Sequence, residues 1–155
     1  MGSPRAALLV PFALRAAASP HFHVRLHFMS SELASEQVVN QRIRSRIAEY
    51  LEMLVAYESD PSLWSLNETI NQWEDWVRSP ASEDQFPAPT YTQSECTHLI
   101  AVDRAWLAFA DVTPQSLMDS VAEMKRPEWG ALVQSAREAL DVFMQRGRLP
   151  EDHEM

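Results

Sequence analysis

Apolar residues recur in steps of three and four along much of the chain, which is the spacing that one face of an α-helix requires. The first such stretch spans 35–58, and Asp60-Pro61 marks its end because the residue before a proline avoids helical geometry. Its apolar face contains Val39, Ile43, Ile47, Tyr50, Leu51, Leu54 and Tyr57. Its charged residues fall mainly elsewhere on the circumference, and we expect them to be solvated: Arg42, Arg44, Arg46, Glu49 and Glu52.

Two capping boxes predict where the next helices begin, because a hydroxyl and a glutamate three residues later satisfy free amides at a helix start. Ser65 with Glu68 begins a second helix, which Ser79-Pro80 stops. Thr92 with Glu95 begins a third. The third helix has a broad apolar face, which suggests a central position and contains Cys96, Leu99, Ile100, Val102, Trp106, Leu107 and Phe109.

Prolines mark the start of the last two helices. Thr113-Pro114 places a capping hydroxyl before a proline at the first helical position, and a short fourth helix follows. Pro127 opens the fifth helix, which ends at Arg146-Gly147 with a basic residue and a C-terminal glycine. No stretch alternates apolar and polar residues long enough to require a strand. The sequence therefore predicts an all-α fold, a single compact bundle of about five helices.

The two ends of the chain differ from its middle. Residues 1–31 contain three arginines and no acid, and we interpret them as an extension that is disordered, targeting-like or not native. The targeting alternatives are a secretory signal and a transit peptide, and under the third interpretation the protein starts at Met29. Residues 32–149 form the predicted bundle domain. Residues 150–155 form an acidic tail that we expect to be solvated.

The charge of the chain favours one class of partner. The formal net charge is −9, and the residues after 31 contain 10 basic and 22 acidic side chains, a net of −12. A protein region with this negative charge repels the phosphate backbones of nucleic acids. We therefore predict no nucleic-acid partner and favour a basic protein as the partner. No apolar run approaches the ~20 residues that cross a bilayer, so no membrane partner is predicted. A single cysteine, Cys96, suits the reducing cytoplasm, and the oligomeric state is left open.

The second helix and the loop that follows it offer a binding surface. Residues 79–93 contain three prolines, and a loop of this length is more often functional than a short one. Phe86 and Tyr91 are expected to pin this loop to the body. Tryptophan is enriched at binding hot spots, and two tryptophans lie at the edge of the second helix. The predicted partner-binding residues are Trp64, Trp76, Glu74, Asp75, Glu83, Asp84 and Phe86.

The candidate chemistry lies at the start of the third helix. Glu95 and His98 form a Glu-x-x-His pattern, an element that di-iron bundles use twice and that occurs once here. Both side chains are candidate metal ligands, and further ligands would have to come from Glu49, Glu52, Glu74 or Asp103. Alternatively, Glu95 favours the positive end of its helix and His98 lies on a partly wet surface. Cys96 near the helix start suggests a nucleophile, but its place on the apolar face favours a buried, inert thiol.

These observations lead to two alternative functions. With only three glycines, phosphate-binding loops are effectively excluded, and no nucleophile elbow or paired-histidine zinc motif is present. We therefore predict a non-catalytic protein-binding module, such as an inhibitor, an immunity-type neutraliser or an adaptor, which uses an acidic and aromatic surface and no cofactor. The alternative is a metal-binding bundle or metal-dependent enzyme centred on Glu95 and His98. An enzymatic activity is left open, with the absence of catalytic motifs favouring none.

Overall fold

The structure, a computed structural model, describes residues 33–60, 65–114 and 120–155. Within these ranges the chain is helical and contains no strand, so the predicted all-α bundle is confirmed. The elements are α1 (Glu36–Ala56), α2 (Leu66–Asn71), α3 (Trp73–Trp76), the 3-10 helix η1 (Glu83–Gln85), α4 (Gln93–Val112), α5 (Ser120–Glu123) and α6 (Pro127–Arg146). The expectations for residues 1–31 lie outside the described ranges.

The helix ends follow the local signals of the sequence. Ser35 caps α1 by accepting a hydrogen bond from the Val38 amide at 3.3 Å. Both predicted capping boxes are present, with Ser65 at the start of α2 and Thr92 at the start of α4. Helix α6 ends before Gly147, whose φ of 69° is a left-handed conformation that glycine adopts without a Cβ clash.

Two helix predictions need correction. The second predicted helix is divided into α2 and α3 at Gln72 and ends at Trp76, after which Val77 is extended and buried. The predicted start at Thr113-Pro114 is also wrong. Helix α4 continues to Val112, the Thr113 hydroxyl donates to the Phe109 carbonyl at 2.9 Å, and Pro114 lies outside any helix. A hydroxyl beside a helix end can bond back to the preceding turn as well as cap the following one.

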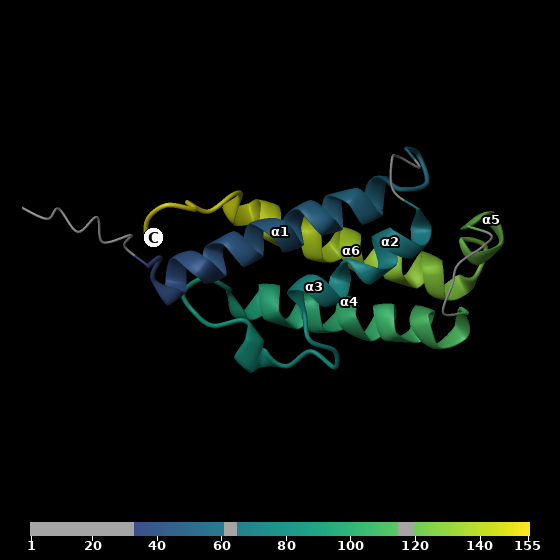
Figure 1. The fold of residues 1–155 in the computed structure, drawn as a ribbon, viewed down its shortest axis with the longest axis horizontal. Coiled ribbons are helices and arrows are strands. Elements are labelled where there is room, and N and C mark those ends of the chain that lie inside the picture. Colours follow the sequence, from purple (N-terminus) through teal and green to yellow (C-terminus); the bar gives the residue numbers. More distant parts are fainter. Residues whose placement is uncertain (1–32, 61–64, 115–119) are drawn as a thin grey trace, which may run out of the picture. The chain divides into compact units, whose positions relative to one another are not determined.

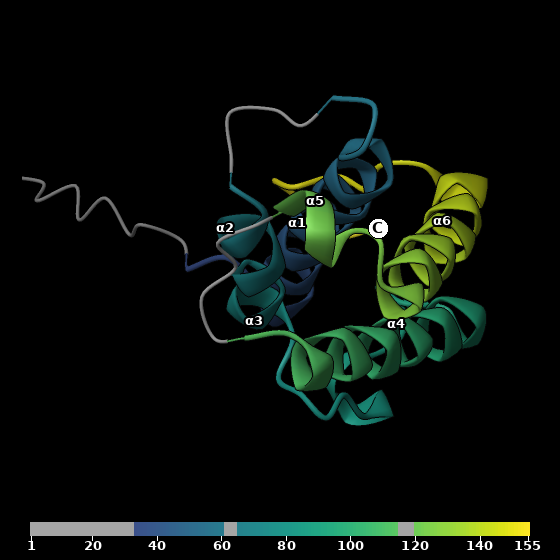
Figure 2. The same ribbon diagram turned by 90° about the vertical axis from the view of Figure 1, so that its right-hand side faces the viewer.

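The described helices form a bundle in which neighbours run in opposite directions. Figure 1 shows α1 and α4 running one way and α2, α3 and α6 running the other. The end-on view in Figure 2 shows these elements surrounding a common centre. Helix α6 packs against both α1 and α4, and α3 packs against α1. Two indole hydrogen bonds join α2 and α3 to α4, from Trp106 to the Ile70 carbonyl at 2.9 Å and from Trp73 to Asp103 at 2.8 Å.

The centre of the bundle is apolar but contains one buried ion-pair network. Arg44 is 1% exposed and its Nη2 lies 2.6 Å from Oε1 of Glu95, while Arg146 lies 3.2 Å from Oε2 of the same carboxylate. The expectation that Arg44 is solvated is therefore wrong. Position 44 shares a helix face with Ala48 and Leu51, both buried, so Arg44 points inward and needs a buried counter-ion.

The last residues of the chain lie along α1. The side-chain amide of Gln41, which is fully buried, donates to the backbone carbonyls of Pro150 and His153, the latter at 2.8 Å. Arg148 forms an ion pair with Glu52 of α1 at 2.9 Å. Residues 152–155 are exposed, as predicted for a solvated tail, but the backbone carbonyls of Pro150 and His153 are bonded to α1. Buried polar groups such as the Gln41 amide require partners, and the tail carbonyls supply them.

Candidate functional site

Helix α3 presents three of the predicted partner-binding residues. Its inner residue, Trp73, is fully buried, which fixes the rotation of this short helix. Glu74 and Asp75 are consequently exposed, and Trp76 is 38% exposed. The position of Trp76 at the edge of the apolar stripe is confirmed. An exposed indole beside two carboxylates is a surface with both apolar area and negative charge.

The acidic residues of η1 are attached to the end of α3. The Arg78 amide donates to the side-chain oxygen of Gln85 at 2.9 Å, and the Gln85 side-chain nitrogen donates to the Arg78 carbonyl at 3.0 Å. These paired bonds hold η1, which contains Glu83 and Asp84, beside the segment that follows Trp76. We call residues 74–84 the acidic face. It contains four acidic side chains and one basic one, Arg78, a net charge of −3.

A buried carboxylate holds the loop that contains the η1 part of this face. Asp103 is 2% exposed, and one of its oxygens accepts hydrogen bonds from the Trp73 indole and the Ser79 hydroxyl. The other oxygen accepts from the Ala81 amide at 2.7 Å. At the far end of the loop, Arg146 donates to the Thr90 carbonyl at 3.0 Å. The sequence gives no signal for these roles, because they depend on which helices become neighbours.

One predicted surface residue is not at the surface. Phe86 is 4% exposed and packs edge-on against Tyr91 with ring centroids 5.3 Å apart. This burial confirms that both rings pin the loop, but the prediction that Phe86 contacts a partner is wrong. A phenyl ring that anchors a loop in the core has no area left for binding. Trp64 lies outside the described residues.

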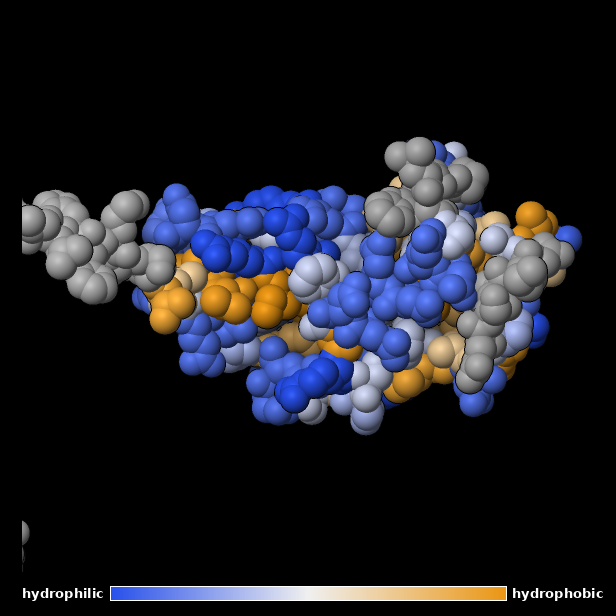
Figure 3. Space-filling view, viewed as in Figure 1, coloured by the Kyte–Doolittle hydropathy of each residue, from blue (hydrophilic) through white to orange (hydrophobic). Residues whose placement is uncertain are grey.

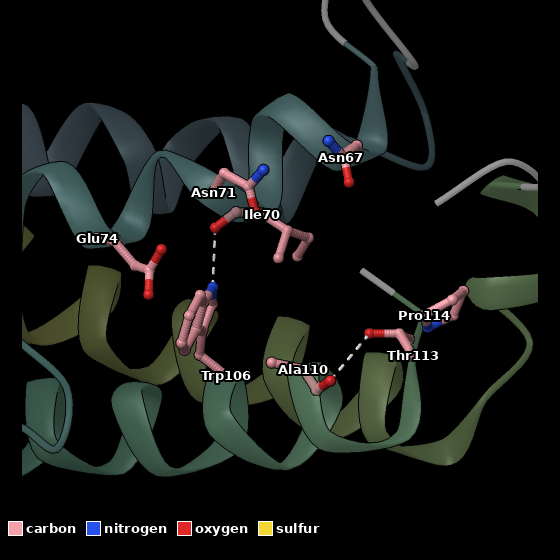
Figure 4. A pocket seen from close by; sticks show the side chains of 8 residues that line it. All are labelled: Asn67, Ile70, Asn71, Glu74, Trp106, Ala110, Thr113 and Pro114. Atoms are coloured by element: carbon pink, nitrogen blue, oxygen red, sulfur yellow. Dashed lines mark hydrogen bonds between the residues drawn. The ribbon is translucent and has the colours of Figure 1, made fainter. Parts of the chain in front are cut away.

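A groove opens beside the acidic face, between α2–α3 and the C-terminal half of α4. Its volume is about 520 Å³, within the range of roughly 300–1,000 Å³ that is typical of ligand pockets. Figure 4 shows its lining, with Glu74 at one end, the Trp106 indole beside it and Thr113 at the other end. Among the described residues, the lining consists of Asn67, Ile70, Asn71, Glu74, Trp106, Ala110, Thr113 and Pro114. Sequence reasoning singled out Glu74 here and missed the groove.

A smaller hollow lies on the other side of α3, against α1. Its volume is about 230 Å³, and Trp76 lines it together with Arg46, Glu49, Tyr50, Met53 and Gln72. The carboxylate of Glu49 lies 2.7 Å from Arg46, so the two charges in this hollow compensate each other. The two sides of α3 therefore differ in charge, and the groove that contains Glu74 is the electronegative one.

The structure gives the candidate metal ligands other roles. Both oxygens of Glu95 face arginines, and one of them also accepts from the Thr92 amide at 3.0 Å. His98 is partly exposed, and its Nδ1 lies 2.7 Å from the Ser94 carbonyl one turn earlier. Among the described residues, no group of three histidine, cysteine or carboxylate side chains is arranged to hold a metal ion. The metal site stays a prediction to which the geometry adds no further ligand.

The single thiol is part of the core. Cys96 is 5% exposed and its Sγ donates to the Phe86 carbonyl at 3.3 Å. Burial raises the pKa of this thiol above its ordinary value, and the nearby carboxylates of Glu83 and Glu95 act in the same direction. A raised pKa disfavours the thiolate, which is the nucleophilic form. The prediction of a buried thiol is confirmed.

Comparison with known proteins gives no match to a family model, a curated protein or a solved structure. Within the described part of the chain, none of the helices has the length and apolar character that crossing a membrane requires.

Figure 3 shows that the face with α2 and α3 is covered mainly by hydrophilic side chains, with apolar patches between the elements.

Proposed function

We propose that this chain is a non-catalytic binding module, acting as an inhibitor, neutraliser or adaptor, that recognises a basic protein through its acidic face. The observation that carries the proposal is the joining of α3 and η1 through Arg78 and Gln85. This link holds the acidic residues of η1 beside the segment that follows α3, which itself carries Glu74, Asp75 and the exposed Trp76. Complementary charge steers a basic partner to such a surface, and an indole supplies apolar contact area.

The distribution of ion pairs supports the same proposal. Glu74 and Asp75 form no hydrogen bond or ion pair with any residue that the structure describes, whereas Glu49, Glu52 and Glu95 each face an arginine. Carboxylates without an internal partner keep their full charge available to another molecule. The negative charge that is free to act across an interface is therefore present on α3.

The residues that suggested chemistry in the sequence have structural roles instead. Glu95 compensates two arginines, and Cys96 lies in the core with a raised pKa. A binding module explains the arrangement without a reactive centre. We further propose the cytoplasm as its compartment, because a lone reduced thiol suits a reducing environment.

The test is capture of basic proteins by the immobilised full-length chain from a native lysate at low salt. We expect captured proteins of high isoelectric point, released by about 0.3 M salt because screening weakens charge-dominated contacts. The double charge reversal E74K/D75K should lower capture strongly. The matched control E138K/D141K changes the net charge equally, but on exposed positions of α6.

Two outcomes would contradict the proposal. One is the absence of a reproducible basic partner at low salt. The other is an equal loss of capture in both charge-reversal variants, which would mean that net charge alone is responsible and that α3 has no special role.

A further inference from the structure

We propose that the groove beside Trp106 receives an arginine side chain of the partner protein, with its guanidinium group against Glu74. This inference rests on the proposed function and adds the chemistry of one contact to it. The described groove lining combines a carboxylate at one end with both apolar side chains and the polar side chains of Asn67, Asn71 and Thr113 (Figure 4).

The polar groups of the groove favour a donor-rich cation. The indole N–H of Trp106 is already donated to the Ile70 carbonyl at 2.9 Å, and the Thr113 hydroxyl is donated to the Phe109 carbonyl. No arginine, lysine or histidine is among the lining residues that the structure describes. Glu74 and the side-chain amide of Asn71, which can both donate and accept, have no hydrogen-bond partner among the described residues. The carboxylate favours an occupant that donates hydrogen bonds and compensates a negative charge.

The apolar part of the lining favours a long side chain. Ile70 and Trp106 are both 5% exposed, so they form a firmly packed wall and not mobile surface groups. Ala110 lines the same space and leaves room because its side chain is short. An aliphatic stem that lies along this wall buries its methylene groups while its charged end reaches Glu74.

Arginine fits this combination better than lysine. The guanidinium group is planar, presents five donors and binds a carboxylate through two parallel hydrogen bonds. It is also more weakly hydrated than an ammonium group, so it lies against an indole and an isoleucine at a lower desolvation cost. The ammonium group of lysine is compact and strongly hydrated, and gains less from an apolar wall.

The test uses two-dimensional NMR of the full-length 15N-labelled chain titrated with N-acetyl-arginine amide. The indole N–H of Trp106 reports directly on the groove, and the Trp129 indole, which donates to Glu58 at 2.6 Å elsewhere in the bundle, is an internal control. We expect a saturable shift of the Trp106 signal with no matching shift of the Trp129 signal. N-acetyl-citrulline amide, which has nearly the same shape without the charge, should give no saturable shift.

Variants separate the groove from general charge. E74Q should weaken arginine binding by about tenfold, the size expected for the loss of one charge-assisted hydrogen bond. N71K places a cation one turn from Glu74 and should block binding by occupying the carboxylate from within the chain. The control D141N, an exposed position on α6, should bind as the unchanged protein does.

Three results would overturn the inference: no saturable shift at Trp106, equal binding of N-acetyl-lysine amide, or equal weakening by E74Q and D141N. Self-association that E74Q abolishes would also overturn it, by assigning the groove to a second copy of the chain. Failure of the groove and failure of the proposed function are distinguishable. If capture of a basic protein depends on Glu74 and Asp75 but the groove binds no arginine, the proposed function is supported and only the proposed arginine site in the groove is contradicted.

Discussion

At the scale of single residues, Glu95 shows how one position serves three purposes. It completes the capping box of α4, compensates the buried charge of Arg44 and contacts Arg146. The capping role is readable from the sequence because its partner, Thr92, lies three residues away. The ionic roles are not readable from the sequence, because Arg44 is 51 residues away. Only the packing of α1 against the rest of the bundle brings Arg44 close to Glu95.

Glu95→Gln is expected to lower the free energy of unfolding by about 3–5 kcal/mol, because it leaves the Arg44 guanidinium buried without its counter-charge. Glutamine is compatible with a capping box, so the helix start is preserved. Chemical denaturation with urea measures the change. Glu49→Gln removes an exposed partner of Arg46 and should cost less than about 1 kcal/mol. Equal losses in the two variants would show that the buried network contributes no more than a surface pair.

Cys96 is expected to react slowly with a thiol reagent in the folded protein. Burial raises the pKa of its thiol, so the thiolate fraction at a given pH is lower than for an unhindered cysteine, and the core also blocks access. Labelling by a chromogenic disulfide at pH 8 should be more than about tenfold slower than in denaturant. Rapid labelling of the folded chain would contradict the described position of this side chain.

At the scale of elements, the loop between α3 and α4 depends on α4. Its prolines predict an irregular segment, and its aromatic residues predict anchoring, both of which the structure bears out. Its attachment through Asp103 was not predictable, since an aspartate next to an arginine within a helix resembles an ordinary exposed pair. The division of the second helix at Gln72 was also not predictable from the sequence, because the apolar residues of α2 and α3 continue one helical stripe.

Asp103→Asn is expected to loosen the loop at its start. The variant keeps one acceptor oxygen but replaces the other with a donor, which leaves the Ala81 amide without its partner. We expect faster hydrogen exchange at Ala81 and a loss of roughly 1–3 kcal/mol in the free energy of unfolding. Asp111→Asn, exposed on the same helix, is the control. Unchanged exchange at Ala81 in the variant would contradict this account of the loop.

At the scale of the whole molecule, the three-and-four spacing of apolar residues was sufficient to predict the helical bundle. Burial followed that spacing for most positions, with exceptions in both directions. Val39 and Leu107 lie on predicted apolar faces yet are 42% and 38% exposed, while the charged Arg44 is buried. The groove was beyond sequence reasoning because residues from α2, α3 and α4 create it together.

The net charge governs how copies of the molecule interact in solution. With a formal charge of −9 at pH 7 and an isoelectric point near 4.9, mutual repulsion should keep the protein dispersed at neutral pH and vanish near pH 5. We expect a solubility minimum close to pH 4.9, measured as turbidity against pH at fixed protein concentration. Solubility that stays constant between pH 7 and pH 4.5 would contradict this expectation.

The two arginines that share one glutamate also constrain how this sequence can change over time. Because Arg44 is enclosed, a neutral residue at position 95 is tolerable only together with a neutral residue at position 44. Arg146 is more accessible and can be exchanged with fewer consequences. In descendants of this chain, positions 44 and 95 should therefore be inherited as a linked pair.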